Sequence, residues 1–283
     1  MADPQETKPC LKLGMVNFIN TSPIYIPWLK QGPLKGWEVI EDHPAALNKM
    51  LHCGELDAGL VSSFAYGERY PDYLLLPGLS ISASGPVGSV LLISKEDPKN
   101  LDGKKIGLTQ QSATSTRLLN IILEDFWGLK PHYLPQSPYE WLEQGKCSAY
   151  MAIGDEALRL RDKCSSLYIV DLADIWLKET GLPFVFAVWA IRKAAFERSR
   201  ELFKILQQRL LTCLKTGLKQ LDEISSTVAP KIPMDKDECV SYLQGIDMEL
   251  KKAHQKGLSL FFSKLYARGD LPKKVKLNFA DIA

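Results

Sequence analysis

The sequence has 283 residues, of which 46% are hydrophobic and 24% are charged, which is ordinary usage for a globular protein. A chain of this length is more often two domains than one. Its formal net charge of +2, without a run of Lys or Arg among aromatic residues, argues against a nucleic-acid-binding surface and leaves small molecules or proteins as partners.

The sequence also argues against a membrane or secreted protein. No segment approaches the roughly eighteen apolar residues that a membrane helix needs, and the polar residues 1–9 lack the apolar core of a signal peptide. The six cysteines are scattered, with no CxxC pair and no His at metal-ligand spacing. We therefore expect a cytoplasmic protein with free thiols and no metal site, behind a disordered N-terminus over residues 1–10.

Residues 11–16 predict a first strand, apolar around Gly14, and a polar loop over residues 17–22 follows it. Pro23, a residue favoured in the first turn of a helix, then begins a helix. Asn, Thr and Ser are common at helix N-termini, where free N–H groups attract anions such as carboxylates. This loop is therefore predicted to form one wall of a binding site, with Asn20 at its centre.

The next elements alternate between strand and helix. Apolar patterns predict strands over residues 37–41 and 56–61, a helix over residues 44–51 between them, and another helix over residues 64–69. This alternation is typical of βαβ units in a parallel sheet.

A later part of the chain repeats this layout. A strand over residues 104–109 meets the hydroxyl-rich loop 110–115, and a helix over residues 116–123 follows, as in the segment around Asn20. Later strands, over residues 131–134 and 148–153, match the second and third strands of the first copy. Each copy is a predicted βαβαβ half whose polar loop lies at the carboxyl end of a strand, where ligands bind in open α/β sheets.

The two copies indicate two lobes. The polar loop 96–100 is where the chain is expected to cross to the second lobe, and the apolar run 181–191 is the predicted strand that brings it back, followed by helices. The predicted fold is α/β, with one lobe over residues 11–96 and 190–283 and the other over residues 97–189. Small ligands usually bind in the cleft between such lobes.

This architecture resembles the type II periplasmic-binding-protein fold, and several motifs together resemble the chorismate dehydratase family of the futalosine route to menaquinone. The motifs follow one another along nearly the whole chain: VNFINTSPIY (16–25), LDAGLVSSFAYG (56–67), SGPVGSVLLIS (84–94), SATSTRLL (112–119), MAIGDEAL (151–158) and GLPFVFAVW (181–189). Each motif alone is weak, but their order and spacing together are fairly specific.

The resemblance implies a cytoplasmic lyase that needs no cofactor and converts chorismate to 3-(1-carboxyvinyloxy)benzoate and water. Its partner would be this small-molecule substrate, and the protein could be a monomer or a homodimer. A sister family that forms dihydroxynaphthoate in the same pathway shares the fold but relies on a histidine, and no His lies in the candidate loops here. A carboxylate-binding protein without catalysis, such as a transport receptor or a sensor, is a further alternative.

Asn20 is the predicted catalytic residue, because the resemblance implies that the Asn at this position faces the substrate. An amide is a poor base, so Asn20 would orient the substrate while the substrate's own enolpyruvyl carboxylate takes the proton. From the sequence alone, the alternative is that Asn20 caps the helix that follows it or forms an Asx-turn.

The other predicted substrate-binding residues offer hydroxyl groups, backbone amides or a carboxyl group. Ser84 and Ser89 flank a Gly-Pro turn, and Ser89 matches the family's binding position better, although a plain turn role is the alternative for both. The remaining positions lie at the second helix N-terminus and after the strand 148–153, where capping is the alternative role. They are Ser112, Ala113, Thr114, Ser115, Gly154 and Asp155.

Overall fold

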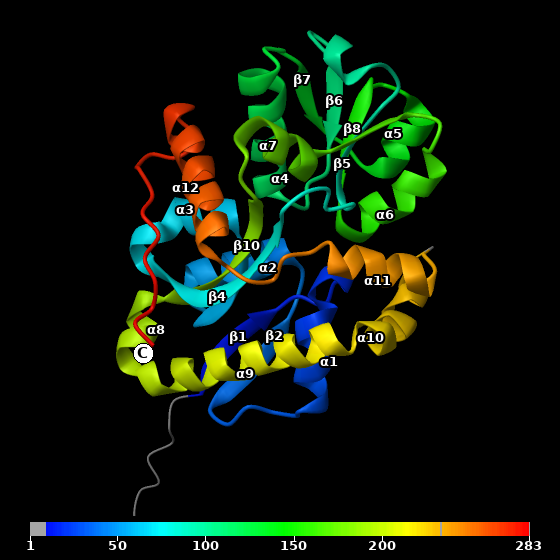
Figure 1. The fold of residues 1–283 in the computed structure, drawn as a ribbon. Coiled ribbons are helices and arrows are strands. Elements are labelled where there is room, and N and C mark those ends of the chain that lie inside the picture. The colour runs from blue at the N-terminus through cyan, green and yellow to red at the C-terminus, as the bar shows by residue number, and fades with distance from the viewer. Residues whose placement is uncertain (1–9, 233, 283) are drawn as a thin grey trace, which may run out of the picture.

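The computed structural model describes residues 10–232 and 234–282, so the predicted disordered N-terminus lies almost wholly outside the described residues. Two five-stranded sheets form the centres of two lobes, and helices pack around each sheet (Figure 1). This arrangement confirms the predicted two-lobed α/β architecture.

The first sheet contains the N-terminal strands. β1 (Leu11–Met15) pairs in parallel with β2 (Trp37–Glu41) and β3 (Ala58–Ser62), because α1 (Ser22–Lys30) and α2 (Pro44–Cys53) make the crossovers between these strands.

Two longer strands complete the first sheet. β10 (Phe184–Arg192) pairs antiparallel with β3 on one side and with β4 (Tyr73–Ala83) on the other, so the strand order is β2-β1-β3-β10-β4. α3 (Ser63–Arg69) begins directly after β3, and the side chain of Ser62 accepts a hydrogen bond from the Ala65 N–H at its first turn.

The second sheet repeats the strand order of the first. Its strands are, in spatial order, β7 (His132–Pro135), β6 (Lys105–Leu108), β8 (Ala149–Ile153), β5 (Val90–Ser94) and β9 (Tyr168–Asp171). β6 pairs in parallel with β7 and β8 as β1 does with β2 and β3, so the predicted internal repeat is confirmed in the strand order. The helical segments of this lobe are α4 (Ala113–Asn120), a π-helical continuation over Ile121–Phe126, α5 (Pro138–Gln144), α6 (Gly154–Lys163) and α7 (Leu172–Thr180).

Two strands lie on the other side of the predicted lobe boundaries. β5, which the boundary at residue 96 assigns to the first lobe, is hydrogen-bonded between β8 and β9 in the second sheet. β10, most of which falls inside the predicted second lobe, belongs to the first sheet. Every residue of β5 is buried, as is typical of a strand inside a sheet that is covered on both faces. We therefore propose that the chain crosses between lobes at residues 84–89 and 181–183.

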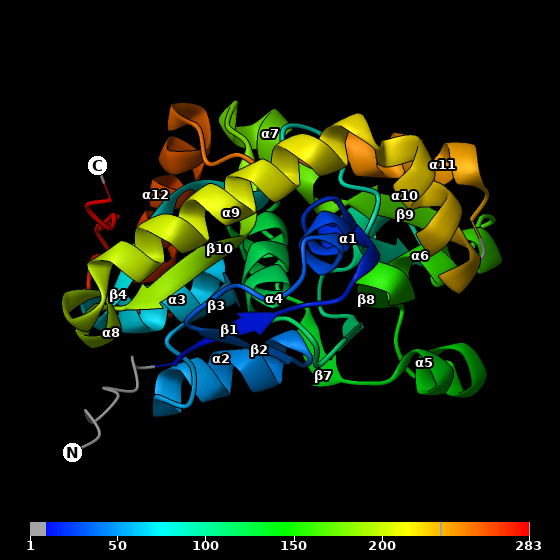
Figure 2. The same ribbon diagram turned by 90° about the horizontal axis from the view of Figure 1, so that it is seen from below.

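The C-terminal helices return to the first lobe. They are α8 (Lys193–Arg198), α9 (Arg200–Lys219), α10 (Leu221–Val228), α11 (Lys236–Gln244) and α12 (Lys252–Ala267). The long helix α9 crosses the molecule beside α1 (Figure 2). The two helices approach so closely that a Cβ atom on Gly217 of α9 would lie 1.8 Å from the carbonyl oxygen of Pro23 in α1.

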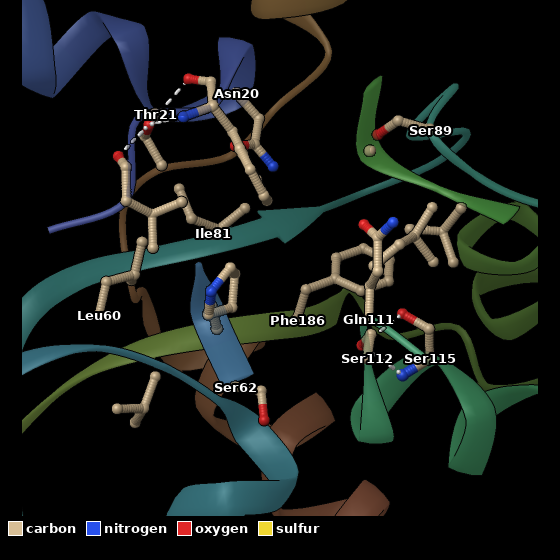
Figure 3. A pocket seen from close by; sticks show the side chains of 18 of the residues that line it. Asn20, Thr21, Leu60, Ser62, Ile81, Ser89, Gln111, Ser112, Ser115 and Phe186 are labelled. Carbon is tan, nitrogen blue, oxygen red and sulfur yellow. Dashed lines mark hydrogen bonds between the residues drawn. The ribbon is translucent and has the colours of Figure 1, made fainter. Parts of the chain in front are cut away.

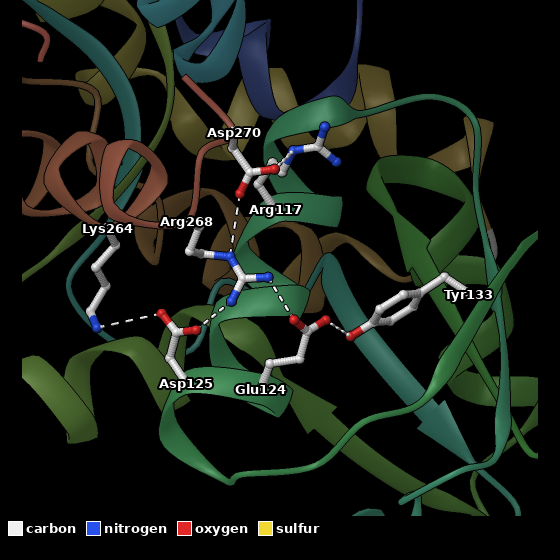
Figure 4. A network of polar contacts seen from close by, with 7 residues as sticks. All are labelled: Arg117, Glu124, Asp125, Tyr133, Lys264, Arg268 and Asp270. Carbon is white, nitrogen blue, oxygen red and sulfur yellow. Dashed lines mark hydrogen bonds and ion pairs between the residues drawn. The ribbon is translucent and has the colours of Figure 1, made fainter. Parts of the chain in front are cut away.

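An ion-pair network joins the segment after α12 to the second lobe (Figure 4). The guanidinium group of Arg268 donates to Glu124 at 2.6 Å, to Asp270 at 3.3 Å, and to Asp125. Asp270 also pairs with Arg117 of α4, with 2.9 Å between Oδ1 and Nε. Glu124 and Asp125 belong to the π-helical stretch, a rare form of helix. The network therefore fixes the C-terminal end of the helix that begins at the cleft.

Replacement of Arg268 with Ala tests how much this network contributes to the stability of the fold. Three carboxylates, whose side chains are 31%, 26% and 18% exposed, would lose the cation that they share. We expect the free energy of unfolding in urea to fall by about 2–3 kcal/mol. Arg161→Ala, which removes an exposed pair with Asp162, should cost less than about 0.5 kcal/mol. Equal losses in the two variants would contradict a structural role for the network.

Candidate active site

A cavity of about 310 Å³ lies between the lobes, and both predicted loops contribute to its wall (Figure 3). Asn20 of the first lobe and Ser89 and Ser112 of the second lobe lie around the same space. The polar residues that line the cavity are Asn20, Thr21, Asn48, Ser62, Ser89, Gln110, Gln111, Ser112 and Ser115. Apolar side chains, among them Leu60, Ile81 and Phe186, form the rest of the wall.

None of the described residues that line this cavity carries an ionisable side chain. A bound anion would therefore have to be held by neutral hydroxyl, amide and backbone N–H groups. Such donors are effective in a water-poor site, where the local dielectric constant is low. The same composition means that no side chain of the lining is a strong base.

The loop after β1 presents Asn20 to the cavity. The hydroxyl group of Thr21 donates to the carbonyl oxygen of Val16 at 2.7 Å and accepts from the Phe18 N–H at 3.2 Å, and these bonds hold the loop in a tight turn. The Oδ1 atom of Asn20 is buried and has no hydrogen-bond partner among the described residues. Asn20 therefore does not cap α1, and a buried amide without a partner is free to bind a ligand.

The second loop closes the opposite wall. Ser112 accepts the Ser115 N–H at 3.1 Å and so caps α4, and its hydroxyl group donates to that of Ser115 at 3.0 Å. Ser112, Ala113 and Ser115 all line the cavity at the positive end of this helix. Thr114 points elsewhere, because its hydroxyl group accepts the N–H of Phe64 in the first lobe at 2.9 Å.

The two serines at the crossing between the lobes differ. Ser89 lines the cavity and is only 2% exposed. Ser84 is not among the lining residues, and its hydroxyl group donates to Asp247. Asp247 also contacts the ring of His254 at 3.1 Å, and that contact is the main cause that lowers the pKa of the Asp247 carboxyl group. Ser84 thus belongs to a separate polar cluster rather than to the cavity.

Gly154 and Asp155 lie at the rim of the cavity. Gly154 lines it, and its N–H donates to the carbonyl oxygen of Ser89 at 2.7 Å. Asp155 lies just outside, in an outer cleft that it shares with His43, Arg159 and Lys163. Burial raises the pKa of Asp155, and the positive charge of Arg159 together with the backbone N–H of Ile19, which belongs to the opposite lobe, partly offsets that effect.

Sequence reasoning missed other polar groups of the cavity. Asn48 lies within α2, where the apolar spacing indicated an ordinary amphipathic helix, yet its buried Oδ1 atom has no partner among the described residues. Gln110 and Gln111 directly precede the predicted serines and also line the cavity. Their place in the hydroxyl-rich loop was the one available signal for them.

The described residues offer two further negative observations. No group of His, Cys, Asp and Glu within residues 10–232 and 234–282 is arranged to hold a metal ion. No helix in this part of the chain is long and apolar enough to cross a membrane.

Residues 11–267 match a protein family described as menaquinone biosynthesis. The chain is 31% identical over 273 residues to the chorismate dehydratase of Thermus thermophilus, a match that covers 89% of this chain and 94% of that protein. It is also 33% identical over 179 residues to the chorismate dehydratase of Campylobacter jejuni, across 62% of this chain and 64% of that protein.

Solved structures with lower identity share the fold. A protein of Archaeoglobus fulgidus is 16% identical and matches with a TM-score of 0.74, over 94% of this chain and all of that one. The alkanesulfonate-binding protein SsuA of Xanthomonas axonopodis, also 16% identical, matches with a TM-score of 0.69, over 95% of this chain and 96% of that one. These likenesses confirm the predicted periplasmic-binding-protein fold.

The raised pKa of Asp155 gives a testable pH dependence. A carboxyl group whose pKa is raised by folding stabilises the protein below its ordinary pKa of 3.8, and this contribution is lost as the pH rises through the raised pKa. Asn cannot titrate, so Asp155→Asn should gain thermal stability relative to the wild type as the pH rises from about 4 to about 7.

The matched control for this prediction is Asp162→Asn, which replaces an exposed carboxylate on the same helix, α6. The difference in thermal stability between Asp162→Asn and the wild type should change less over the same pH series, because an exposed carboxylate keeps its hydration. If the thermal stability of Asp155→Asn relative to the wild type stays constant with pH, or falls as the pH rises, the buried environment of Asp155 is refuted.

Proposed function

The chain belongs to the menaquinone biosynthesis family, and we propose that it is a chorismate dehydratase, a hydro-lyase that removes water from chorismate. The product would be 3-(1-carboxyvinyloxy)benzoate. The observation that carries this proposal is a cavity between the lobes that offers many neutral hydrogen-bond donors and no ionisable side chain among its described lining residues.

Chorismate carries two carboxylates, an enol ether and a hydroxyl group on a cyclohexadiene ring. The cavity can divide these groups between its walls. The N-terminus of α4, with Ser112 and Ser115, suits one carboxylate, and Ser89 can donate to the other. Apolar side chains such as Ile81 and Phe186 suit the faces of the ring.

The reaction needs a proton to leave C3 and a hydroxyl group to leave C4. The electrons of the C3–H bond form the new C3–C4 double bond while the C4–O bond breaks, and the ring becomes aromatic. No lining side chain is a suitable base, so we propose that the enolpyruvyl carboxylate of the substrate takes the proton from C3. The departing hydroxyl oxygen gains the proton that the carboxylate took from C3, so water leaves, the carboxylate is regenerated and the atoms balance.

Asn20 would hold the substrate in the geometry that this transfer requires. Its Oδ1 atom is buried without a partner, so its amide group is available to the substrate. Because the scaffold fixes the loop through Thr21, the amide would need little reorganisation during the reaction. Asn20 is then an orienting group rather than a base.

We also infer a cytoplasmic location. All six cysteines are free thiols, and four of them are buried, as suits a reducing compartment. Both walls of the cavity come from a single chain, so a monomer or a homodimer could each carry the proposed activity.

Purified protein mixed with chorismate alone tests the proposed function. A dehydratase should produce the aromatic enol ether without any added cofactor, as followed by the absorbance spectrum and by mass analysis of the product. Chorismate that binds but stays unchanged would instead indicate a carboxylate-binding protein. Chorismate that neither binds nor reacts would leave the sister dihydroxynaphthoate-forming activity as the function to assay.

Replacement of Asn20 with Ala should lower kcat by about a hundredfold or more, because the amide that orients the reacting groups is lost. Steady-state kinetics with chorismate measures the effect, and circular dichroism checks that the variant is folded. Asn100→Ala, at an exposed position on the loop after β5, is the matched control and should retain normal kinetics. Near-normal turnover by the Asn20 variant would refute its role.

A further inference from the structure

Tyr242 lies behind the wall of the cavity, where no sequence motif pointed to it. It belongs to α11, in the C-terminal part of the chain, and is not among the lining residues. Its hydroxyl group donates to the hydroxyl oxygen of Ser89 at 2.9 Å. Ser89, in contrast, lines the cavity and precedes β5 of the second lobe. The hydrogen bond therefore joins a C-terminal helix to a side chain of the opposite wall.

The backbone around Ser89 is fixed independently of Tyr242. The carbonyl oxygen of Ser89 accepts the Gly154 N–H at 2.7 Å, and the N–H of Gly88 donates to Asp171 at 2.6 Å. The ring of Tyr242 lies over Gly88, where a Cβ atom would be 3.7 Å from the ring carbon Cδ2. That distance is an ordinary van der Waals contact, so the ring packs against Gly88 and the phenol approaches a rigid acceptor.

The direction of the hydrogen bond between Tyr242 and Ser89 decides which hydroxyl hydrogen is available to a ligand. A serine hydroxyl group has one hydrogen to donate and two lone pairs that can accept. Because Tyr242 donates, it occupies a lone pair of Ser89 and leaves the Ser89 hydrogen available. Burial raises the pKa of Tyr242, so the phenol keeps its proton and stays a donor at neutral pH. No described residue accepts the Ser89 hydrogen, and the side chain faces the cavity.

We propose that Tyr242 is a positioning residue, which acts through Ser89 and directs the Ser89 hydrogen toward a carboxylate of the bound substrate. This inference rests on the proposed function, because it takes chorismate as the anion that Ser89 meets. Tyr242 would also strengthen that donor, since a hydroxyl group that accepts one hydrogen bond donates the next one more strongly.

A double-mutant cycle with Tyr242→Phe and Ser89→Ala tests the proposal. Phe keeps the ring and removes only the hydroxyl group, so Tyr242→Phe should fold and lose about tenfold in kcat/KM, mainly through a higher KM for chorismate. In the Ser89→Ala background the same change should have almost no further effect, because the group through which Tyr242 acts is gone. Losses that multiply would show that Tyr242 does not act through Ser89.

Tyr66→Phe is the matched control. The hydroxyl group of Tyr66 accepts the Asn278 N–H at 3.2 Å within the first lobe, and Tyr66 does not line the cavity. This variant should lose thermal stability but keep kcat/KM. A comparable loss of kcat/KM in both Tyr variants would overturn the specific role of Tyr242.

The wild type separates failure of this inference from failure of the proposed function. If the wild type converts chorismate and the cycle is additive, the function stands and the role of Tyr242 falls. If the wild type binds chorismate without converting it, the same cycle is measured on Kd by calorimetry, with the same expected non-additivity. If it neither binds nor converts chorismate, the function and the role of Tyr242 both fall.

Discussion

In a cavity without ionisable lining residues, the binding of a charged ligand depends on how accurately the neutral dipoles of the wall point at that ligand. Hydroxyl and amide donors weaken steeply with distance and angle, whereas a cation attracts over a longer range. Much of the scaffold around the cavity serves this accuracy. Thr21 fixes the turn that carries Asn20, Ser112 closes the first turn of α4, and the Arg268 network holds the far end of the same helix.

The two halves of the fold share a strand order but supply different chemistry. The loop after β1 contributes a single amide whose oxygen has no partner within the described chain, and the loop after β6 contributes hydroxyl groups at a helix N-terminus. The wall formed by the loop after β6 is thus suited to binding a negative charge, and the wall formed by the loop after β1 is suited to orienting the groups that react. An internal repeat can build such a site because each copy presents its loop at the same edge of its sheet.

The sequence predicted those features that depend on local pattern. The alternation of strands and helices, the repeat, and the two polar loops that meet in one cavity all follow from periodicity and capping residues. It could not predict the direction of individual side chains, which tertiary packing decides: Ser84 turns to Asp247, and Thr114 turns to the first lobe. Asn48 carried no signal because its helix shows an ordinary amphipathic spacing. The sequence of β5 is apolar enough for either sheet, so it did not indicate which sheet the strand joins.

The close approach of α9 to α1 fixes the position of the helix that follows the Asn20 turn. Any side chain on Gly217 would collide with the carbonyl oxygen of Pro23, so α9 packs directly against the start of α1. Residues 11–30, transplanted into another protein or expressed without α9, would retain their strand and helix propensities but lose the surface against which the start of α1 packs. The position of the loop that carries Asn20 therefore depends on two distant parts of the chain.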